Sequence, residues 1–405
     1  MKNLAYIIKA LTPPGKTGSK WRALTPHDAL DRRSFLFRSG GALCLCALGD
    51  FNIVSCIDES SASKDATEGF AKIAMHWKKL DKSTVQCGLC PNECVLGNGE
   101  RGACRVRENR KGTLYTLVYS RLATMHVDPV EKKPFFHFLP GSMAYSVATA
   151  GCNFSCKFCQ NWELSQAKPE DLDAVMVSPD ALAHRAHASS SRIIAFTYNE
   201  PTIQYEYIID ASRKAREKHL RPVIVSNGYI RPEAGRQLTT SLDAIKIDLK
   251  SFSQKFYGEI CGGVLNHVLK NLELVHKSGT WLEIVVLVIP TLNDSESEIR
   301  SMVRWVKRNL SADVPMHFTR FQSTYLMRNL PPTPVEALER CREAARAEGI
   351  RYAYVGNVPG HRWENTYCHN CGAMIIRRGG FYAVTSMLRN GHCPHCATRI
   401  PGVWV

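Results

Sequence analysis

The chain has 405 residues, of which 44% are hydrophobic, and a formal net charge of +15. This length allows one large domain with appendages or two domains, and the composition is that of a globular protein that buries a core. No apolar run reaches the roughly 18 residues of a membrane-spanning helix, and no nucleic-acid-binding motif accompanies the basic charge, so we expect a solvated basic surface without a nucleic-acid partner.

Residues 1–70 are predicted to be an export-signal-like extension and linker, and are left out of the fold argument. Residues 31–36, Asp-Arg-Arg-Ser-Phe-Leu, resemble a twin-arginine export signal, and residues 53–56 resemble a lipoprotein processing site that ends at Cys56. This pattern predicts export or membrane anchoring at Cys56. The alternative is a chance Arg32-Arg33 pair in a cytoplasmic protein.

Residues 71–142 are predicted to form a cysteine-rich segment that holds a metal. Its four cysteines fall within 18 residues and include a Cys-x2-Cys pair, a spacing that favours metal sites over disulfides. Four thiolates close a coordination shell, so we predict a structural zinc or an auxiliary iron–sulfur cluster; a disulfide pair is the alternative if the protein is exported. The four cysteines are Cys87, Cys90, Cys94 and Cys104.

Residues 143–360 alternate apolar, β-branched runs with helical patterns, which predicts a parallel sheet built from βαβ units. Six such units make an α/β fold of the partial (β/α)6 barrel type, with the functional groups at the carboxyl ends of the strands. The predicted strands are 143–150, 192–197, 222–227, 244–250, 281–289 and 314–320, with one more short strand at 352–355. The predicted helices are 202–218, one from 232, 264–278, 295–310 and 334–348.

The loop after the first predicted strand carries Cys152, Cys156 and Cys159, spaced by three and then two residues. Thiolates are soft ligands that favour iron–sulfur clusters and zinc. A cubane [4Fe–4S] cluster needs four iron ligands, so three thiolates leave one iron open to a substrate or cofactor. The alternative is a zinc site whose fourth ligand lies elsewhere.

Polar residues also stand where three later strands end. Asp248 and Lys250 are two residues apart on a strand, so their side chains face the same side; a surface ion pair is the alternative. The polar residues at the ends of the other two strands are Asn199, Glu200, Ser226 and Asn227.

Two further positions are left open by the sequence. The segment 128–141 is predicted to line the barrel mouth, where Lys132, Lys133 and His137 would be substrate groups or a solvated basic turn. His317 would bind ribose or substrate, or be a satisfied interior histidine.

Residues 361–405 contain two Cys-x2-Cys knuckles separated by 21 residues, the spacing of a zinc ribbon. We predict one tetrahedral zinc and a short hairpin from segments 374–381 and 382–388. The predicted ligands are Cys368, Cys371, Cys393 and Cys396.

The run Cys-x3-Cys-Lys-Phe-Cys at 152–159 resembles the signature of radical S-adenosylmethionine (SAM) enzymes. The motifs Asp-Pro-Val-Glu-Lys-Lys-Pro-Phe-Phe-His-Phe at 128–138, Thr-Tyr-Asn-Glu-Pro at 197–201 and Glu-Asn-Thr-Tyr-Cys at 364–368 resemble the AmmeMemoRadiSam-system branch, which is related to pyruvate formate-lyase (glycyl-radical) activating enzymes. In that superfamily three thiolates hold a [4Fe–4S] cluster, SAM chelates the open iron, and reductive cleavage gives a 5′-deoxyadenosyl radical that abstracts hydrogen.

The resemblance implies roles for residues of this chain. Phe158 is expected near the adenine of SAM. Ser226-Asn227 and Asp248-Leu249-Lys250 resemble the Thr-Asn-Gly and Asp-Leu-Lys segments of activating enzymes, which places them at SAM. Asn199-Glu200 occupies the place of the family's Gly-Gly-Glu segment, but without the glycines.

These expectations combine into a radical SAM oxidoreductase that abstracts hydrogen from an unknown substrate, for which a glycine of a partner protein is one candidate. Its cofactors would be a [4Fe–4S] cluster, SAM and zinc, and its reductant a flavodoxin- or ferredoxin-like protein of low potential. The alternative is an iron–sulfur electron-transfer or sensing protein that does not cleave SAM.

Overall fold

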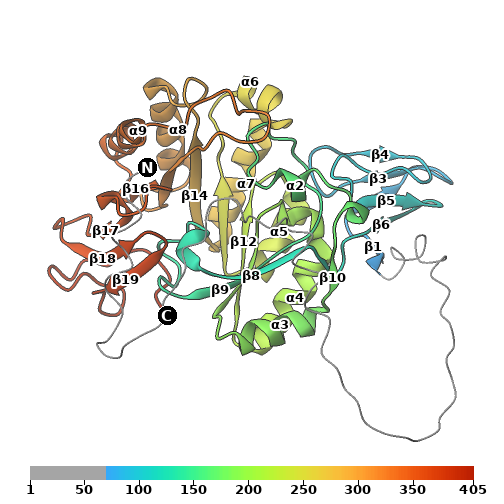
Figure 1. Cartoon of the computed structure of the whole chain (residues 1–405), viewed down its shortest axis with the longest axis horizontal. Helices are drawn as coiled ribbons and strands as arrows, with labels where there is room; N and C mark the ends of the chain where they lie inside the picture. The colour runs from blue at the N-terminus through green and yellow to red at the C-terminus, as the bar shows by residue number, and fades with distance from the viewer. Residues whose placement is uncertain (1–69) are drawn as a thin grey trace, which may run out of the picture. The chain divides into compact units, whose positions relative to one another are not determined.

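The structure, a computed structural model, describes residues 70–405 and is built around an eight-stranded sheet (Figure 1). The strand order is β16-β15-β14-β13-β12-β11-β9-β8, in which neighbours from β9 to β16 are parallel and β8 is antiparallel to β9. Most strand residues are buried, as expected of a parallel sheet covered on both faces. The strands are β8 (Thr124–Pro129), β9 (Met143–Ala148), β11 (Ile193–Phe196), β12 (Arg221–Ser226), β13 (Ala244–Asp248), β14 (Trp281–Val288), β15 (Met316–Arg320) and β16 (Ala353–Gly356).

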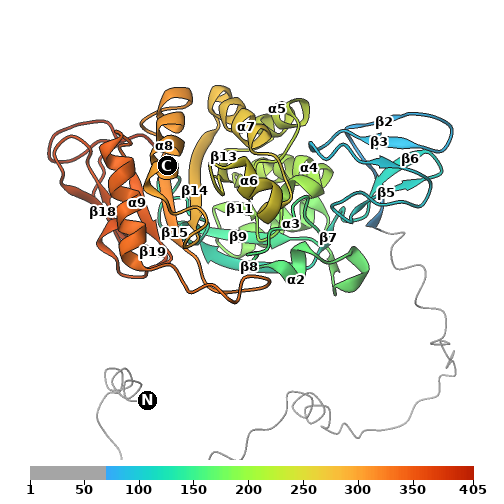
Figure 2. The ribbon, with the colours of Figure 1, turned by 90° about the horizontal axis from the view of Figure 1, so that it is seen from above.

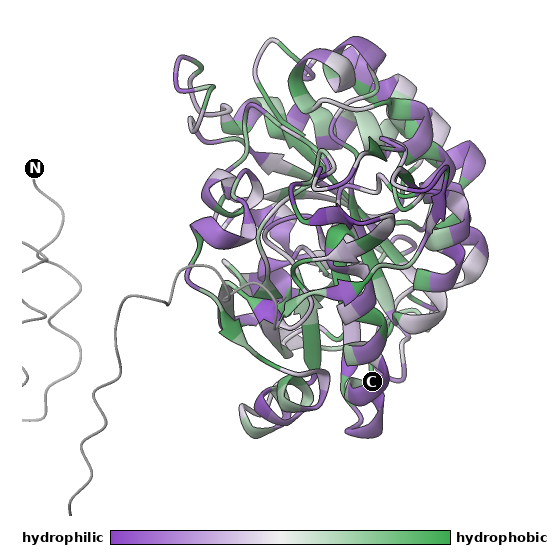
Figure 3. Cartoon of the chain, turned by 90° about the vertical axis from the view of Figure 1, so that its right-hand side faces the viewer, coloured by the Kyte–Doolittle hydropathy of each residue, from purple (hydrophilic) through white to green (hydrophobic). Residues whose placement is uncertain are grey.

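Helices connect the parallel strands and cover the outside of the curved sheet, as Figure 2 shows from above. In Figure 3 the apolar strands lie inside, while the helices carry polar residues on their outer surfaces. The predicted α/β partial barrel is therefore confirmed, and most predicted strands agree within two residues. The helices are α2 (Trp162–Ser165), α3 (Pro179–Ala188), α4 (Tyr205–Glu217), α5 (Pro232–Ser241), α6 (Gln254–Phe256), α7 (Leu265–Ser278), α8 (Glu296–Asn309) and α9 (Val335–Ala347).

The segment before β9 differs from its prediction. Phe135, Phe138 and Leu139 pack in a buried cluster against Ala144 and Ile193, which lie at the amino ends of β9 and β11. This part of the segment therefore closes the amino end of the barrel, whereas the sequence predicted that it would line the mouth. The apolar side chains of Phe-Phe-His-Phe-Leu explain the difference, because they bury more area in the barrel interior than at its polar edge.

The cysteine-rich segment forms two small antiparallel sheets, β1-β6-β5 and β2-β3-β4. Arg107 on β5 forms a buried ion pair with Glu206 on α4, which fixes this segment to the barrel. A further two-stranded sheet pairs β7 with β10. The strands are β1 (Lys72–Ile73), β2 (Trp77–Lys79), β3 (Val85–Cys87), β4 (Val95–Leu96), β5 (Arg107–Arg110), β6 (Thr113–Thr116), β7 (Arg121–Leu122) and β10 (Val175–Met176).

The C-terminal module is a three-stranded sheet in the order β17-β18-β19, at the end of this unit opposite the cysteine-rich segment (Figures 1 and 2). Arg378 on β18 is 5% exposed and donates to the carbonyl oxygens of Glu364 and Phe136, so it joins the module to the segment before β9. The strands are β17 (Thr366–Tyr367), β18 (Met374–Gly379) and β19 (Tyr382–Ser386).

The predicted export features, Arg32-Arg33 and Cys56, lie outside the described residues. Within residues 70–405, we find no helix with both the length and the apolar character to cross a bilayer.

Candidate functional site

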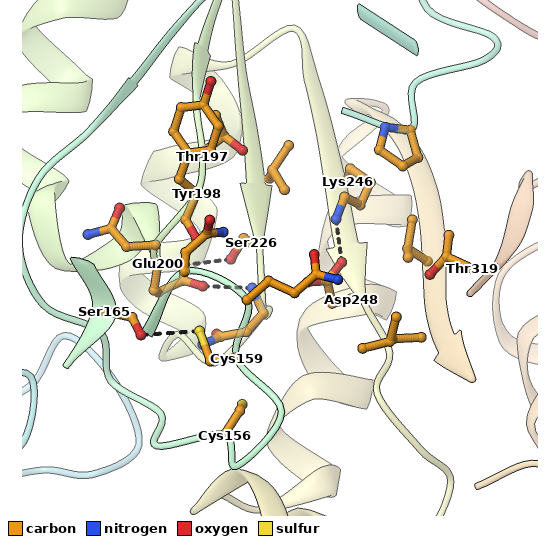
Figure 4. A pocket seen from close by; sticks show the side chains of 18 of the residues that line it. Cys156, Cys159, Ser165, Thr197, Tyr198, Glu200, Ser226, Lys246, Asp248 and Thr319 are labelled. Carbon is orange, nitrogen blue, oxygen red and sulfur yellow. Dashed lines mark hydrogen bonds and ion pairs between the residues drawn. The ribbon is translucent and has the colours of Figure 1, made fainter. Parts of the chain in front are cut away.

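A cavity of about 420 Å³ lies inside the barrel, within the usual size range of small-molecule sites. The cysteine loop forms one wall, and the segment that follows β11 and residues from β12, β13, β14 and β15 form others (Figure 4). The sequence-predicted residues Cys152, Cys156, Cys159, Phe158, Asn199, Glu200, Ser226, Asn227, Asp248 and Lys250 all line this cavity.

The cysteine loop is held from outside the cavity by a short π-helix, η5 (Tyr257–Cys261). The Ser155 amide donates to the Cys261 carbonyl at 2.9 Å, and the Lys157 amide donates to the Ile260 carbonyl at 3.0 Å. A Cβ atom at Gly263 would lie 2.3 Å from the Phe154 ring, so only glycine permits this approach. The loop's backbone is therefore fixed while its three thiols face the cavity.

Glu200 organises the ends of β11 and β12. Its carboxylate accepts from the Thr202 amide and hydroxyl, from the Ser226 hydroxyl at 2.7 Å and from the Asn227 amide at 2.6 Å. Burial raises the pKa of Glu200, although these donors oppose the shift. The structure thus gives Glu200, Ser226 and Asn227 a mutual bonding role at the cavity wall.

Asn199 connects the strand end to the cysteine loop. Its Nδ2 donates to the carbonyl oxygens of Thr149 and Gly151, both at 2.8 Å. Its Oδ1 is buried and has no hydrogen-bond partner among the residues that the structure describes. A buried acceptor without a partner is costly, so this atom is available to a donor on a ligand in the cavity.

Asp248 lies between two lysines, one of which the sequence argument missed. Lys250 Nζ is 3.3 Å from Asp248 Oδ2, and Lys246 pairs with the other carboxylate oxygen. Although burial opposes it, the pKa of Asp248 is lowered by the two ammonium groups. The same period of two that placed Lys250 beside Asp248 also places Lys246 there, so this residue was readable from the sequence. The group carries a net charge of +1.

Cys261 is a second residue that the sequence argument missed. It is buried on the π-helix, its carbonyl accepts from the amide of Ser155 next to Cys156, and its thiol lowers the pKa of Cys156. It does not line the cavity, and it therefore lies behind the loop and away from the open side. No local motif marks Cys261, because its proximity depends on the packing of residues about a hundred positions apart.

The sequence left alternatives open at Lys133, His137 and His317, and the structure gives a different answer for each residue. Lys133 is 3% exposed and lines the cavity with Lys132, so the alternative of a solvated basic turn is wrong for Lys133. His137 is fully buried outside the cavity between Tyr354 and the Pro401 carbonyl, so both of its alternatives, a substrate group and a solvated basic turn, are wrong. His317 is an interior histidine whose Nε2 pairs with Glu283 at 2.7 Å and which does not line the cavity, so the ligand alternative is wrong there too; its Nδ1 has no hydrogen-bond partner among the described residues, so the ring is only partly satisfied. Both histidine side chains are therefore buried in the barrel interior, although their rings are polar.

The C-terminal cysteines converge. The four sulfur atoms lie within 4.8 Å of one another, with Cys368–Cys396 at 3.6 Å and Cys371–Cys393 at 3.7 Å. A tetrahedral ion with 2.3 Å bonds to sulfur would separate the sulfurs by about 3.8 Å. The geometry therefore fits one tetrahedral metal ion.

The N-terminal cysteines line a separate small cavity beside the buried Arg107 guanidinium. Arg107 Nη1 lies 3.8 Å from the Cys87 sulfur. A positive group at this place would offset the negative charge of bound thiolates. The four cysteines at this cavity are Cys87, Cys90, Cys94 and Cys104.

The main cavity also suits the cofactors that the cysteine motif implies. Three soft thiols fit three irons of a cluster, the unpartnered Asn199 Oδ1 fits an ammonium donor, and Lys250 fits a carboxylate. Phe158, which is 5% exposed, adds an aromatic face with Lys250 Nζ 5.5 Å from its ring centre.

Known proteins resemble this chain in sequence and, more distantly, in structure. Residues 146–306 match the radical SAM superfamily. The chain is 40% identical over 329 residues to the uncharacterized protein MJ0808 of Methanocaldococcus jannaschii, covering 81% of this chain and 98% of that protein. It is 24% identical over 161 residues to the pyruvate formate-lyase-activating enzyme of Clostridium pasteurianum, covering 39% of this chain and 66% of that enzyme. The crystal structure of Streptococcus suis SuiB bound to S-adenosylmethionine aligns with a TM-score of 0.43 and 14% identity over 59% of this chain and 56% of SuiB.

Proposed function

The chain belongs to the radical SAM superfamily, and from this premise we propose that it uses a [4Fe–4S] cluster and SAM to abstract a hydrogen atom from its substrate. It is related to the glycyl-radical activating enzymes. The observation that carries the proposal is the single cavity that joins three thiols, an unpartnered acceptor on Asn199 and the Lys246–Asp248–Lys250 group. The flanking motifs at 128–138 and 364–368 support its placement in the AmmeMemoRadiSam-system branch.

Each cavity residue receives a role in this proposal. Cys152, Cys156 and Cys159 hold the cluster, whose chemistry when SAM is bound is the reductive cleavage that yields a 5′-deoxyadenosyl radical. Asn199 Oδ1 accepts from the SAM amino group, and Lys250 binds its carboxylate. Phe158 lies at the adenine.

Glu200, Ser226 and Asn227 support this SAM site from the cavity wall. Glu200 already accepts four hydrogen bonds from the protein. Only the part of its carboxylate that these bonds leave free can contact SAM directly. The substrate class that the relatives suggest is a protein whose glycine loses hydrogen, and the electron donor is a flavodoxin- or ferredoxin-like protein.

The test is anaerobic reconstitution of the full chain, reduction with dithionite and addition of SAM. The expected products are 5′-deoxyadenosine and methionine in equal amounts. An intact cluster that yields neither product would overturn the enzyme proposal and favour electron transfer or sensing. A protein substrate is then tested by mixing the enzyme and unlabelled SAM with a deuterated candidate partner protein. Deuterium that appears in 5′-deoxyadenosine shows that the abstracted atom came from that partner.

The ribbon cysteines Cys368, Cys371, Cys393 and Cys396 are proposed to hold one zinc ion. The sulfur separations support a tetrahedral site, and all four ligands come from the protein, as in structural zinc sites. The N-terminal four-cysteine group is proposed to hold zinc or an auxiliary cluster. Metal analysis of the purified protein, with iron and zinc counted separately, tests both assignments.

Export through the Arg32-Arg33 signal, with anchoring at Cys56, is a further proposal that rests on the sequence pattern alone. Replacing Arg32-Arg33 by Lys-Lys is expected to retain the protein in the cytoplasm. An unchanged distribution between cell fractions would overturn it.

A further inference from the structure

A second Lys–Asp–Lys group, formed by Lys132, Asp128 and Lys133, has no role in the SAM site described above, and its two lysines line the same cavity. Asp128 Oδ1 accepts from Lys132 Nζ at 2.8 Å, and Asp128 Oδ2 accepts from Lys133 Nζ at 2.7 Å and from the Tyr198 hydroxyl at 2.6 Å. Lys133 Nζ also donates to the Tyr198 oxygen at 3.2 Å. Three segments of the chain, from β8, the turn after β8 and the end of β11, therefore meet at one carboxylate.

This group has unused donors and a surplus positive charge. Each ammonium has three N–H donors. Among the hydrogen bonds of the described residues, Lys132 uses one donor and Lys133 uses two. Asp128 neutralises one of the two lysines, since the donors around it lower its pKa against the effect of burial. One positive charge and three N–H groups therefore remain at the cavity wall.

A purely structural ion pair would not need the second lysine. Burying a charge is unfavourable even after the surroundings relax, and Lys133 is 3% exposed. Burial lowers the pKa of Lys133, Asp128 opposes this shift, and the positive charges of Lys132 and of Lys246, which is itself paired with Asp248, lower it further. Such a cationic wall is stable when an anion completes it.

The group lies away from the cysteine loop. Asp128 pairs with Ala144, four residues before the end of β9, so it lies about 13 Å back along the strand from the end that leads into the loop. In Figure 4, Tyr198 lies at one end of the cavity and Cys156 at the other. A ligand bound to Lys132 and Lys133 would thus leave the space beside the cysteines free.

The backbone of Tyr198 is held in an unusual conformation that aims its hydroxyl at Asp128. Its φ is +69°, in the left-handed region that is unfavourable for a non-glycine residue. The Asn161 side chain fixes this turn by donating to the Tyr198 carbonyl at 2.8 Å. The next residue, Asn199, holds the cysteine loop, so one strained turn sets both ends of the cavity.

We propose that Lys132 and Lys133 bind an oxyanion of the substrate, a carboxylate or a phosphate, and so hold its reacting carbon between them and the cysteine loop. Asp128 and Tyr198 position the two ammonium groups. This inference rests on the proposed function, since it assigns SAM to the end of the cavity near Lys250 and the substrate to the other end.

The test measures anion binding rather than turnover. The full chain, reconstituted anaerobically and saturated with SAM so that Lys250 is occupied, is dialysed to equilibrium against radiolabelled inorganic phosphate or acetate in a buffer free of other oxyanions. Saturable binding of at least one probe at one site per chain is expected, and the preferred probe tells phosphate from carboxylate. Absence of saturable binding of both probes overturns the inference.

Three variants locate the site. Lys133→Met is expected to weaken binding of the preferred probe at least tenfold, and Lys132→Met about threefold. Lys270→Met, an exposed lysine on α7, is expected to bind the probe as the wild type does. Because Lys132 is half-exposed, Lys132→Met keeps the test valid if Lys133→Met does not fold.

The SAM dissociation constant separates this inference from its rival. If the group serves the substrate, SAM affinity changes less than threefold in Lys132→Met and Lys133→Met. A tenfold loss of SAM affinity, or probe binding equal to that of the wild type, overturns the inference. The proposed function fails on a different result, namely a wild-type protein that forms no 5′-deoxyadenosine.

Discussion

The cysteine loop and the C-terminal ribbon use the same ligand type but differ in completeness. The ribbon brings four sulfur atoms within 4.8 Å of one another, whereas the loop presents three thiols to a cavity of about 420 Å³. Structural metal sites are closed by the protein, and catalytic sites keep a position open for an external ligand. The number of thiols that the protein supplies to a site, more than their spacing in the sequence, therefore distinguishes a structural metal site from a reactive one.

The largest expected effect comes from removing one thiol of the open site. Cys152→Ala is expected to abolish 5′-deoxyadenosine formation and to lose about four irons per chain, because two thiolates do not hold the cluster. Zinc bound at the ribbon should stay unchanged. Iron and zinc analysis together with product chromatography checks both halves; loss of both metals would show that the two sites are not independent.

Removing a thiol of the closed site should reduce zinc content and stability, and should leave iron content and product formation largely intact. Cys396→Ala is expected to lose one zinc per chain and to lower the melting temperature by several degrees, since a structural metal contributes folding free energy. Iron content should be retained, and 5′-deoxyadenosine formation should fall less than tenfold. A fall as large as that of Cys152→Ala would contradict the scaffold role of the ribbon.

The backbone beneath the cysteine loop offers a subtler way to disturb the open site. Gly151 has φ +89°, and a Cβ atom there would lie 2.4 Å from the Cys104 carbonyl oxygen. Gly151→Ala should therefore destabilise the fold by about 2–4 kcal/mol, from overpacking and left-handed strain, and reduce cluster incorporation. Gly279→Ala is the matched control, with φ +78° and no atom within 4 Å of the added Cβ. Chemical denaturation of both variants checks the difference, and equal losses would exclude the clash.

The sequence predicted those parts of the site that are local in the chain. The cysteine loop and the ribbon knuckles are contiguous motifs, and Asp248 with Lys250 follows from the two-residue period of a strand. Lys246 obeys the same period and was missed only because the family motif begins at Asp248.

Other parts could not be predicted because they depend on distant packing. Cys261 approaches Cys156 across a hundred residues, and Asp128 meets Tyr198 across seventy. The sequence predicts that His137 is a substrate group or part of a solvated basic turn, yet the Phe-rich segment around it folds into the barrel end. No local sequence pattern shows whether such an apolar segment will cover the amino end of the barrel or its mouth.

His137 provides the last expected effect, a loss of stability confined to low pH, and tests how the ribbon is joined to the barrel. Its ring bonds the Tyr354 hydroxyl at 2.5 Å and the Pro401 carbonyl at 2.6 Å. Burial lowers the pKa of His137 to about 4, against the opposing influence of Glu283; nearby Arg378 and His317 lower it further.

Because the folded state binds this proton less readily than the unfolded chain, whose histidine pKa is about 6.5, stability is fully present above pH 6.5. It should decrease by up to about 3 kcal/mol as the pH falls from 6.5 to 4. In His137→Gln this pH-dependent loss should shrink, although the variant starts from a lower stability at pH 7. Denaturation of both proteins at pH 7 and pH 5 checks the slope. Parallel slopes would mean that other groups control the acid sensitivity, and that the buried histidine adds only packing to the join between barrel and ribbon.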